Sequence, residues 1–120
     1  MALSVTKFED AFDYKVIQES ACDNAAIVNV TNSPGMIHSI FLDNTSNQSD
    51  AYFKFFDSQT VGMGSTVADM VFKVKAQSTS AVQIPKGLSF THLSFACTAN
   101  HNPASNNAPG APLTVSIVVS

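Results

Sequence analysis

Three histidines are the side chains of this sequence best suited to bind a metal or to move a proton near neutral pH: His38, His92 and His101. No two of them have the short spacing of a few residues that local metal-binding pairs show. His38 and His92 fall within expected strands, and His101 falls within an expected loop. We expect ordinary surface or partly buried histidines and no metal; a metal site assembled across strands is the open alternative.

The acidic side chains form two groups, and neither has the pattern of a catalytic or calcium site. Glu9, Asp10 and Asp13 lack the alternating oxygen ligands of a calcium loop and suit an exposed helix start or an acidic arm. The second group flanks an aromatic segment, where we expect turn capping rather than a glycosidase pair, and consists of Asp43, Asp50 and Asp57. No nucleophile elbow or phosphate loop is present. The sequence therefore predicts no catalytic residues, no cofactor and no enzymatic activity.

Two cysteines, Cys22 and Cys97, stand far apart in the sequence and form no metal-binding motif. The first residues have neither a basic region nor an apolar stretch, so we expect no secretion signal and folding in a reducing cytoplasm. Cys97 also lies in an apolar run, where a buried thiol behaves as a small hydrophobic group. We expect two reduced, inert thiols, with a disulfide between them as the alternative.

The charge balance excludes several classes of partner. The chain has 120 residues, six lysines, no arginine and nine acidic residues, for a net charge of −3. A net acidic chain without arginine is a poor nucleic-acid binder and is not attracted to a membrane surface. Lys73 and Lys75 are the only lysines close together, and we expect them on the solvated face of a strand. Neutral Ser, Thr and Asn exceed a quarter of the sequence, which suits a surface covered by another protein and equally suits any exposed β-rich surface.

Alternation of apolar and polar residues is the dominant pattern and predicts strands over residues 70–76 and 113–119. A change of phase near His92 indicates a bulge or twist. Further strands are expected over residues 26–31, 36–42, 51–56, 81–84 and 88–97. The expected core consists of Phe53, Phe55, Phe72, Val74, Phe90, Leu113, Val115 and Ile117.

The N-terminal segment is the one place where a helix is expected. A capping box at residues 6–9 predicts a turn or two of helix near residues 6–12, and the alternative for residues 14–19 is a strand. We therefore expect an all-β fold: a single antiparallel β-sandwich, jelly-roll or immunoglobulin-like, of about seven or eight strands with at most one short N-terminal helix. Residues 1–20 would form an arm or a short helix or strand, and residues 21–120 the sandwich.

Turn residues separate these segments. Residues 32–35 and 85–87 are expected to be tight turns, residues 43–50 a polar loop, and residues 100–112 a long surface loop. The segment up to Glu19 has no obvious place in the sheets. The N-terminal segment and the long loop are therefore the expected protein contacts, with Phe8, Phe12, His101, Asn102, Pro103, Asn106 and Pro109 as candidate contact residues.

One series of motifs goes beyond composition. The segment Ala51-Tyr-Phe-Lys-Phe-Phe-Asp-Ser58 is followed by a strand after a glycine-rich link, then by Val82-Gln-Ile-Pro85 and Gly87-Leu-Ser-Phe90. This order resembles small β-sandwich virion structural proteins of tailed bacteriophages, of the capsid cement or decoration type. Members of that group often carry Arg and Gly near the second motif, where this sequence has Lys86 and His92.

The resemblance implies a non-enzymatic virion protein, made in the host cytoplasm, that binds and stabilises an icosahedral capsid. Its partners would be the major capsid protein or other virion proteins and further copies of itself, with a trimer favoured, and neither nucleic acid nor membrane. The first alternative is a tail- or fibre-associated β-sandwich module for assembly or host adhesion. The second alternative is a small cupin-like hydrolase, which the absence of a histidine pair disfavours.

Overall fold

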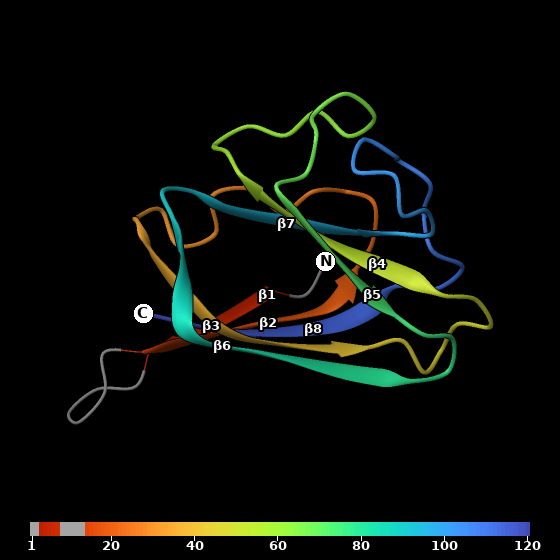
Figure 1. Cartoon of the computed structure of the whole chain (residues 1–120), viewed down its shortest axis with the longest axis horizontal. Helices are drawn as coiled ribbons and strands as arrows, with labels where there is room; N and C mark the ends of the chain where they lie inside the picture. Colours follow the sequence, from red (N-terminus) through yellow and green to blue (C-terminus); the bar gives the residue numbers. More distant parts are fainter. Residues whose placement is uncertain (1–2, 8–13) are drawn as a thin grey trace.

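The computed structural model describes residues 3–7 and 14–120, and shows an antiparallel β-sandwich without a helix in those residues (Figure 1). One sheet has five strands in the order β1-β2-β8-β3-β6, and the other has three in the order β5-β4-β7. The strands are β1 (Leu3–Lys7), β2 (Lys15–Cys22), β3 (Gly35–Asp43), β4 (Ala51–Asp57), β5 (Met70–Val74), β6 (Thr79–Phe90), β7 (Leu93–Thr98) and β8 (Leu113–Val119).

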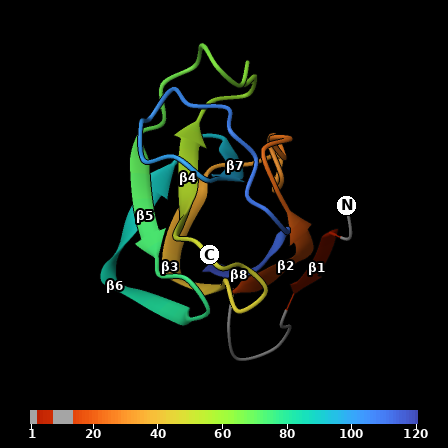
Figure 2. The same cartoon turned by 90° about the vertical axis from the view of Figure 1, so that its right-hand side faces the viewer.

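The connectivity is that of a jelly roll. Ile27 forms an isolated antiparallel bridge with Phe95, so its segment occupies the position of a fourth strand beside β7. Strands β2-β8-β3-β6 then face the series formed by this segment, β7, β4 and β5, and the chain passes repeatedly from one sheet to the other (Figure 2). The expected strand over residues 26–31 is therefore reduced to one bridge.

Apolar side chains at alternate positions fill the space between the sheets. In β8 the buried positions are Leu113, Val115, Ile117 and Val119, as the alternation predicts. Of the eight expected core residues, seven are buried; Phe72 is partly buried against the same cluster. Alternation along residues 70–76 assigns Met70 to the same face as Phe72, yet Met70 is 38% exposed at the start of an edge strand.

Residues 3–7 and 15–19 belong to the five-stranded sheet, contrary to the expectation that residues up to Glu19 lie outside the sheets. β2 pairs with β1 on one side and with β8 on the other, which confirms the alternative of a strand near residues 14–19. The alternation in β2 is hidden because Glu19 is fully buried at an inward position, where its Oε2 accepts a hydrogen bond from the Ala21 N–H. Of the expected helix over residues 6–12, residues 6 and 7 lie in β1, and the rest lies outside the described residues.

Residues 85–87 are not a turn between two strands, because β6 runs through them. Leu88 pairs with Ile37, and Gln83 pairs with Ser39. Residues 84–87 therefore form an enlarged bulge, in which four residues of β6 lie opposite the single residue His38 of β3. Gly87 has φ +79° there, a backbone conformation that other residues rarely adopt. The bulge admits a proline into the strand without a break in the sheet.

The phase change near His92 marks the passage between the sheets rather than a bulge. β6 ends at Phe90 in the five-stranded sheet, and β7 begins at Leu93 in the three-stranded sheet. The Asp57 carboxylate accepts hydrogen bonds from the N–H groups of both intervening residues, Thr91 at 2.9 Å and His92 at 2.8 Å. This short connection fixes how the two sheets are joined at that end.

Candidate contact surface

The loop between β7 and β8 is packed over the outer face of the three-stranded sheet, beside the loop between β4 and β5 (Figure 1). Alternation in β4 directs Phe53 and Phe55 to the core, so Lys54 and Phe56 point outward. Both outward side chains are nevertheless buried, with 0% and 1% exposure. The loops therefore form a third layer over this sheet.

Lys54, on the outer face of β4, holds the β7–β8 loop against the three-stranded sheet. Its Nζ donates hydrogen bonds to the backbone carbonyls of Asn102 at 2.5 Å and of Ser105 at 3.2 Å. Burial lowers the pKa of Lys54 because the charged form loses its water. The two-residue period of a strand is enough to put Lys54 on the same face as Phe56, but it does not reveal that a loop covers the ammonium group.

A buried pair of asparagines anchors the end of the same loop. Asn47 Nδ2 donates to the Ala111 carbonyl at 2.8 Å, and the Ala111 N–H donates to Asn47 Oδ1 at 2.6 Å. Asn47 Nδ2 also donates to Asn44 Oδ1 at 2.7 Å, while Asn44 Nδ2 donates to the carbonyls of Val74 and Lys75. Two side chains of the expected polar loop 43–50 are thus buried hydrogen-bonding partners.

Further contacts fix the middle of the loop. The Ala68 N–H donates to the Pro103 carbonyl at 3.1 Å, which joins the loop to its neighbour before β5. Asn24 Nδ2 donates to the Asn106 carbonyl at 2.9 Å. The ring of His101 lies 6.1 Å from that of Tyr52, centroid to centroid. The loop is therefore attached to the rest of the chain at several points along its length.

The side chains that this loop presents are uncharged and largely exposed. His101, Asn102, Pro103 and Asn106 are exposed, and Pro109 is partly buried. The five predicted contact residues of the loop thus all belong to this anchored segment, and we refer to these five residues together as the ridge. The two other predicted contact residues, Phe8 and Phe12, lie outside the described residues. An uncharged ridge of amides, an imidazole and proline rings can bind another protein by hydrogen bonds and apolar contact.

The three acidic residues that flank β4 cap turns, as expected. Asp43 accepts from the Thr45 N–H and hydroxyl, and these hydrogen bonds lower the pKa of Asp43. A hydrogen bond from the Ala76 N–H and the neighbouring Lys73 lower the pKa of Asp50. Asp57 caps the connection between β6 and β7. Each carboxylate is thus bound to backbone, which is a structural role.

The histidines in strands or beside them make polar contacts with neighbouring segments. His38 Nε2 lies 2.9 Å from Ser120 Oγ, and the Tyr14 ring packs edge-on against His38. His92 Nδ1 lies 3.2 Å from Asn29 Oδ1. Within residues 3–7 and 14–120 no three His, Cys, Asp or Glu side chains are grouped so that they could hold a metal ion.

The two cysteines, 75 positions apart in the sequence, meet in the core. Both thiols are free and fully buried. A hydrogen bond with the Cys97 thiol, together with burial, raises the pKa of Cys22. A buried thiol with a raised pKa reacts slowly.

Among the described residues, no helix has the length and apolar character that a membrane crossing requires. Comparison of the chain with protein-family models, with curated proteins and with solved structures finds no match.

Proposed function

We propose that this protein is a non-enzymatic structural protein of a bacteriophage virion, a capsid decoration protein that binds and stabilises the icosahedral shell. The observation that carries the proposal is the β7–β8 loop, whose exposed, uncharged ridge is fixed from beneath by the buried Lys54 and Asn47. The jelly-roll connectivity adds support by analogy, because viral coat domains use it among other proteins.

A fixed loop is suited to binding because its backbone is already ordered before the partner arrives. Ordering a loop on binding opposes association, so a loop held by internal hydrogen bonds binds more tightly than a free one with the same side chains. The major capsid protein is the proposed partner, and the chain would act as a homo-oligomer, with a trimer at threefold positions. Binding only to the assembled shell stabilises that shell by mass action.

The test is co-sedimentation with undecorated capsids. Replacement of the whole loop would uncover Lys54 and Phe56, so point substitutions at exposed positions are the better probe. The variant His101→Glu with Pro103→Glu places two charges on the ridge, and we expect binding to fall by at least about tenfold. The matched control, Gln18→Glu with Ser20→Glu, places two charges at exposed positions of β2 on the outer face of the five-stranded sheet and should bind like the parent.

The outcomes separate the parts of the proposal. Loss of binding in the control alone would show that the sheet face, and not the loop, contacts the shell. A parent protein that does not sediment with capsids contradicts the decoration function itself. Its copy number in purified particles then tests a tail or fibre module, which is present in few copies where a decoration protein is present in many.

A further inference from the structure

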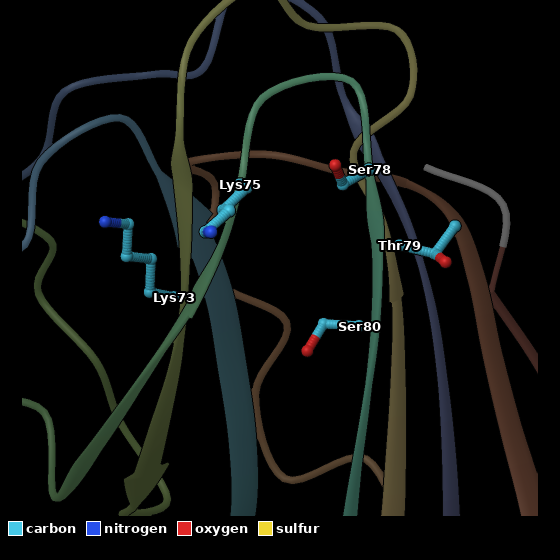
Figure 3. Close-up of a pocket in the computed structure, with 5 residues that line it drawn as sticks. All are labelled: Lys73, Lys75, Ser78, Thr79 and Ser80. Atoms are coloured by element: carbon cyan, nitrogen blue, oxygen red, sulfur yellow. The ribbon is translucent and has the colours of Figure 1, made fainter.

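A hollow of about 350 Å³ opens on the side of the sandwich where β5 and β6 diverge (Figure 3). These strands are the edges of different sheets and are consecutive in the chain, so neither pairs with the other. In Figure 3, Ser78 and Ser80 project toward β5, while Thr79 points the opposite way. The hollow is lined by Lys73, Lys75, Ser78, Thr79 and Ser80. Its size is at the lower end of the range of about 300–1,000 Å³ for ligand pockets.

The core is incompletely covered along this side. Four of the five apolar side chains that are only partly buried against the core belong to the two strands: Phe72 on β5, and Val82, Ile84 and Leu88 on β6. An unpaired strand edge beside partly exposed apolar side chains is the arrangement to which an extended peptide adds. The ligand should therefore supply backbone hydrogen-bonding groups and apolar or aromatic side chains.

The charge at the hollow favours an acidic ligand. Lys75 is exposed, and no carboxylate of the described residues lies within salt-bridge distance of it. Lys73 lies 3.3 Å from Asp50, with both side chains about half exposed, a contact that contributes little and can rearrange. Two ammonium groups against one carboxylate leave the rim positive, and the hydroxyl of Ser80 can donate to a further carboxylate oxygen.

The sequence contains one segment with the matching chemistry, residues 8–13, Phe-Glu-Asp-Ala-Phe-Asp. It combines two aromatic side chains with three carboxylates. Removing these three from the nine acidic residues leaves six, which equals the six lysines, so the whole net charge of −3 corresponds to this segment. The rest of the chain is therefore neutral and does not repel it.

The segment cannot reach the hollow of its own chain. Lys7 and Lys15 flank the segment and pair with each other at one end of the five-stranded sheet, level with Val119 and Ile37. Thr79, at the hollow, pairs with Asp43 at the other end of the sheet. The end of β1 and Thr79 are thus separated by six residues along the strands and by four strand spacings across the sheet. Together these give a distance of roughly 27 Å. A connection of this length with both ends fixed extends at most about 12 Å. The occupant must come from another molecule.

We propose that the β5–β6 hollow binds residues 8–13 of a second copy of this chain, with Lys75 as the principal cation and β6 as the strand edge. The contact joins two different surfaces, so repetition in one direction closes into a ring when the rotation allows, and a trimer is one such ring. This inference rests on the homo-oligomer of the proposed function, but it does not require binding to a shell.

Charge exchange tests this contact with the full-length protein and without capsids. The variant Lys73→Glu with Lys75→Glu reverses the hollow, and Glu9→Lys with Asp10→Lys reverses the segment. Each variant alone should self-associate at least about tenfold more weakly than the parent in sedimentation velocity, because like charges then meet. A mixture of the two variants should self-associate more strongly than either variant alone, because the hollow of each variant then meets the oppositely charged segment of the other. The control Lys86→Glu changes an exposed charge elsewhere on β6 and should have no effect.

A synthetic peptide of residues 7–14 provides a second measurement that does not depend on folding of the variants. Its binding should shift the backbone NMR signals of Lys75 and of residues 78–84, and a peptide with amides in place of its three carboxylates should not. Equal effects of the two peptides, a parent that remains monomeric, or reversed variants that associate like the parent would overturn the proposal. Because no capsid is present, each of these results is distinct from failure of shell binding.

Discussion

The outer faces of the two sheets differ in what covers them. On the three-stranded sheet, Lys54, Phe56 and Ala96 point away from the core and are still buried, because the loops before β5 and before β8 lie over them. On the five-stranded sheet, one outward row holds Gln18, Ser116, Phe41 and Ala81, and Phe41 is 43% exposed. One sheet is thus the middle of three layers, and the other is an outer layer.

This difference explains why some strands show alternation and others do not. β8, in the five-stranded sheet, alternates between buried and more exposed positions along its length. Every residue of β7 is buried, since one face meets the core and the other meets the loops. A strand buried on both sides appears as a continuous apolar or small-residue run. The loops of this protein therefore act as part of the packed structure as well as a contact surface.

The largest effect should come from matched phenylalanine substitutions on the two outer faces. Phe56→Ala removes a ring enclosed by loops and should lower the free energy of unfolding by about 3–5 kcal/mol. Phe41→Ala removes a half-exposed ring from the uncovered face and should cost less than about 1 kcal/mol. Chemical denaturation of both variants measures the difference, and equal costs would show that the loops do not stabilise the sheet that they cover.

Lysine substitutions repeat the comparison with a polar group. Lys54→Ala leaves the Asn102 and Ser105 carbonyls without their donor and should cost about 2–3 kcal/mol. Amide exchange in residues 99–112 should become faster in this variant. Lys73→Ala, at an exposed position, should change stability by less than about 0.5 kcal/mol and leave exchange in the loop unchanged. Faster exchange in both variants would mean that Lys54 is not the anchor.

A smaller effect should appear in the pH dependence. Because burial lowers the pKa of Lys54 below its usual 10.5, the unfolded chain binds more protons than the folded chain between the lowered value and 10.5. The free energy of unfolding of the parent, relative to Lys54→Met, should therefore rise with pH across that alkaline interval. Denaturation curves at several pH values measure the slope, and a fall over the same interval would contradict the assignment. Lys73→Met serves as the control.

The last prediction concerns the reactivity of the two thiols, for which we expect the smallest effect. Cys22 lies on β2 and Cys97 on β7, so the pair lies between the two sheets. Protein made in cytoplasm should carry two free thiols, because Cys22 and Cys97 are unoxidised and enclosed. A thiol reagent should modify neither of them in native protein over the time in which it modifies both after denaturation. Finding no free thiol in denatured, unreduced protein would show a disulfide between the sheets instead.

The sequence by itself determined the fold class and most of the core. Alternation in residues 113–119 and the spacing of Phe53 and Phe55 depend only on the two-residue period of a strand, so they are readable without tertiary contacts. The irregular, Pro- and Asn-rich composition of residues 100–112 likewise identified the long loop. These features are local, and local features are present in a sequence whatever the rest of the chain does.

Tertiary structure alone decided what covers each strand and which polar groups are buried. Lys54 and Asn47 appear in the sequence as an ordinary strand lysine and a loop asparagine, yet their partners lie 48 and 64 residues away. Glu19 interrupts the alternation of β2, and only pairing with β1 and β8 places that strand in the sheet. Alternation states which side of a strand a residue faces. Whether that side meets water, a loop or the opposite sheet depends on distant segments, which is why the anchored loop and the uncovered hollow emerged only from the folded chain.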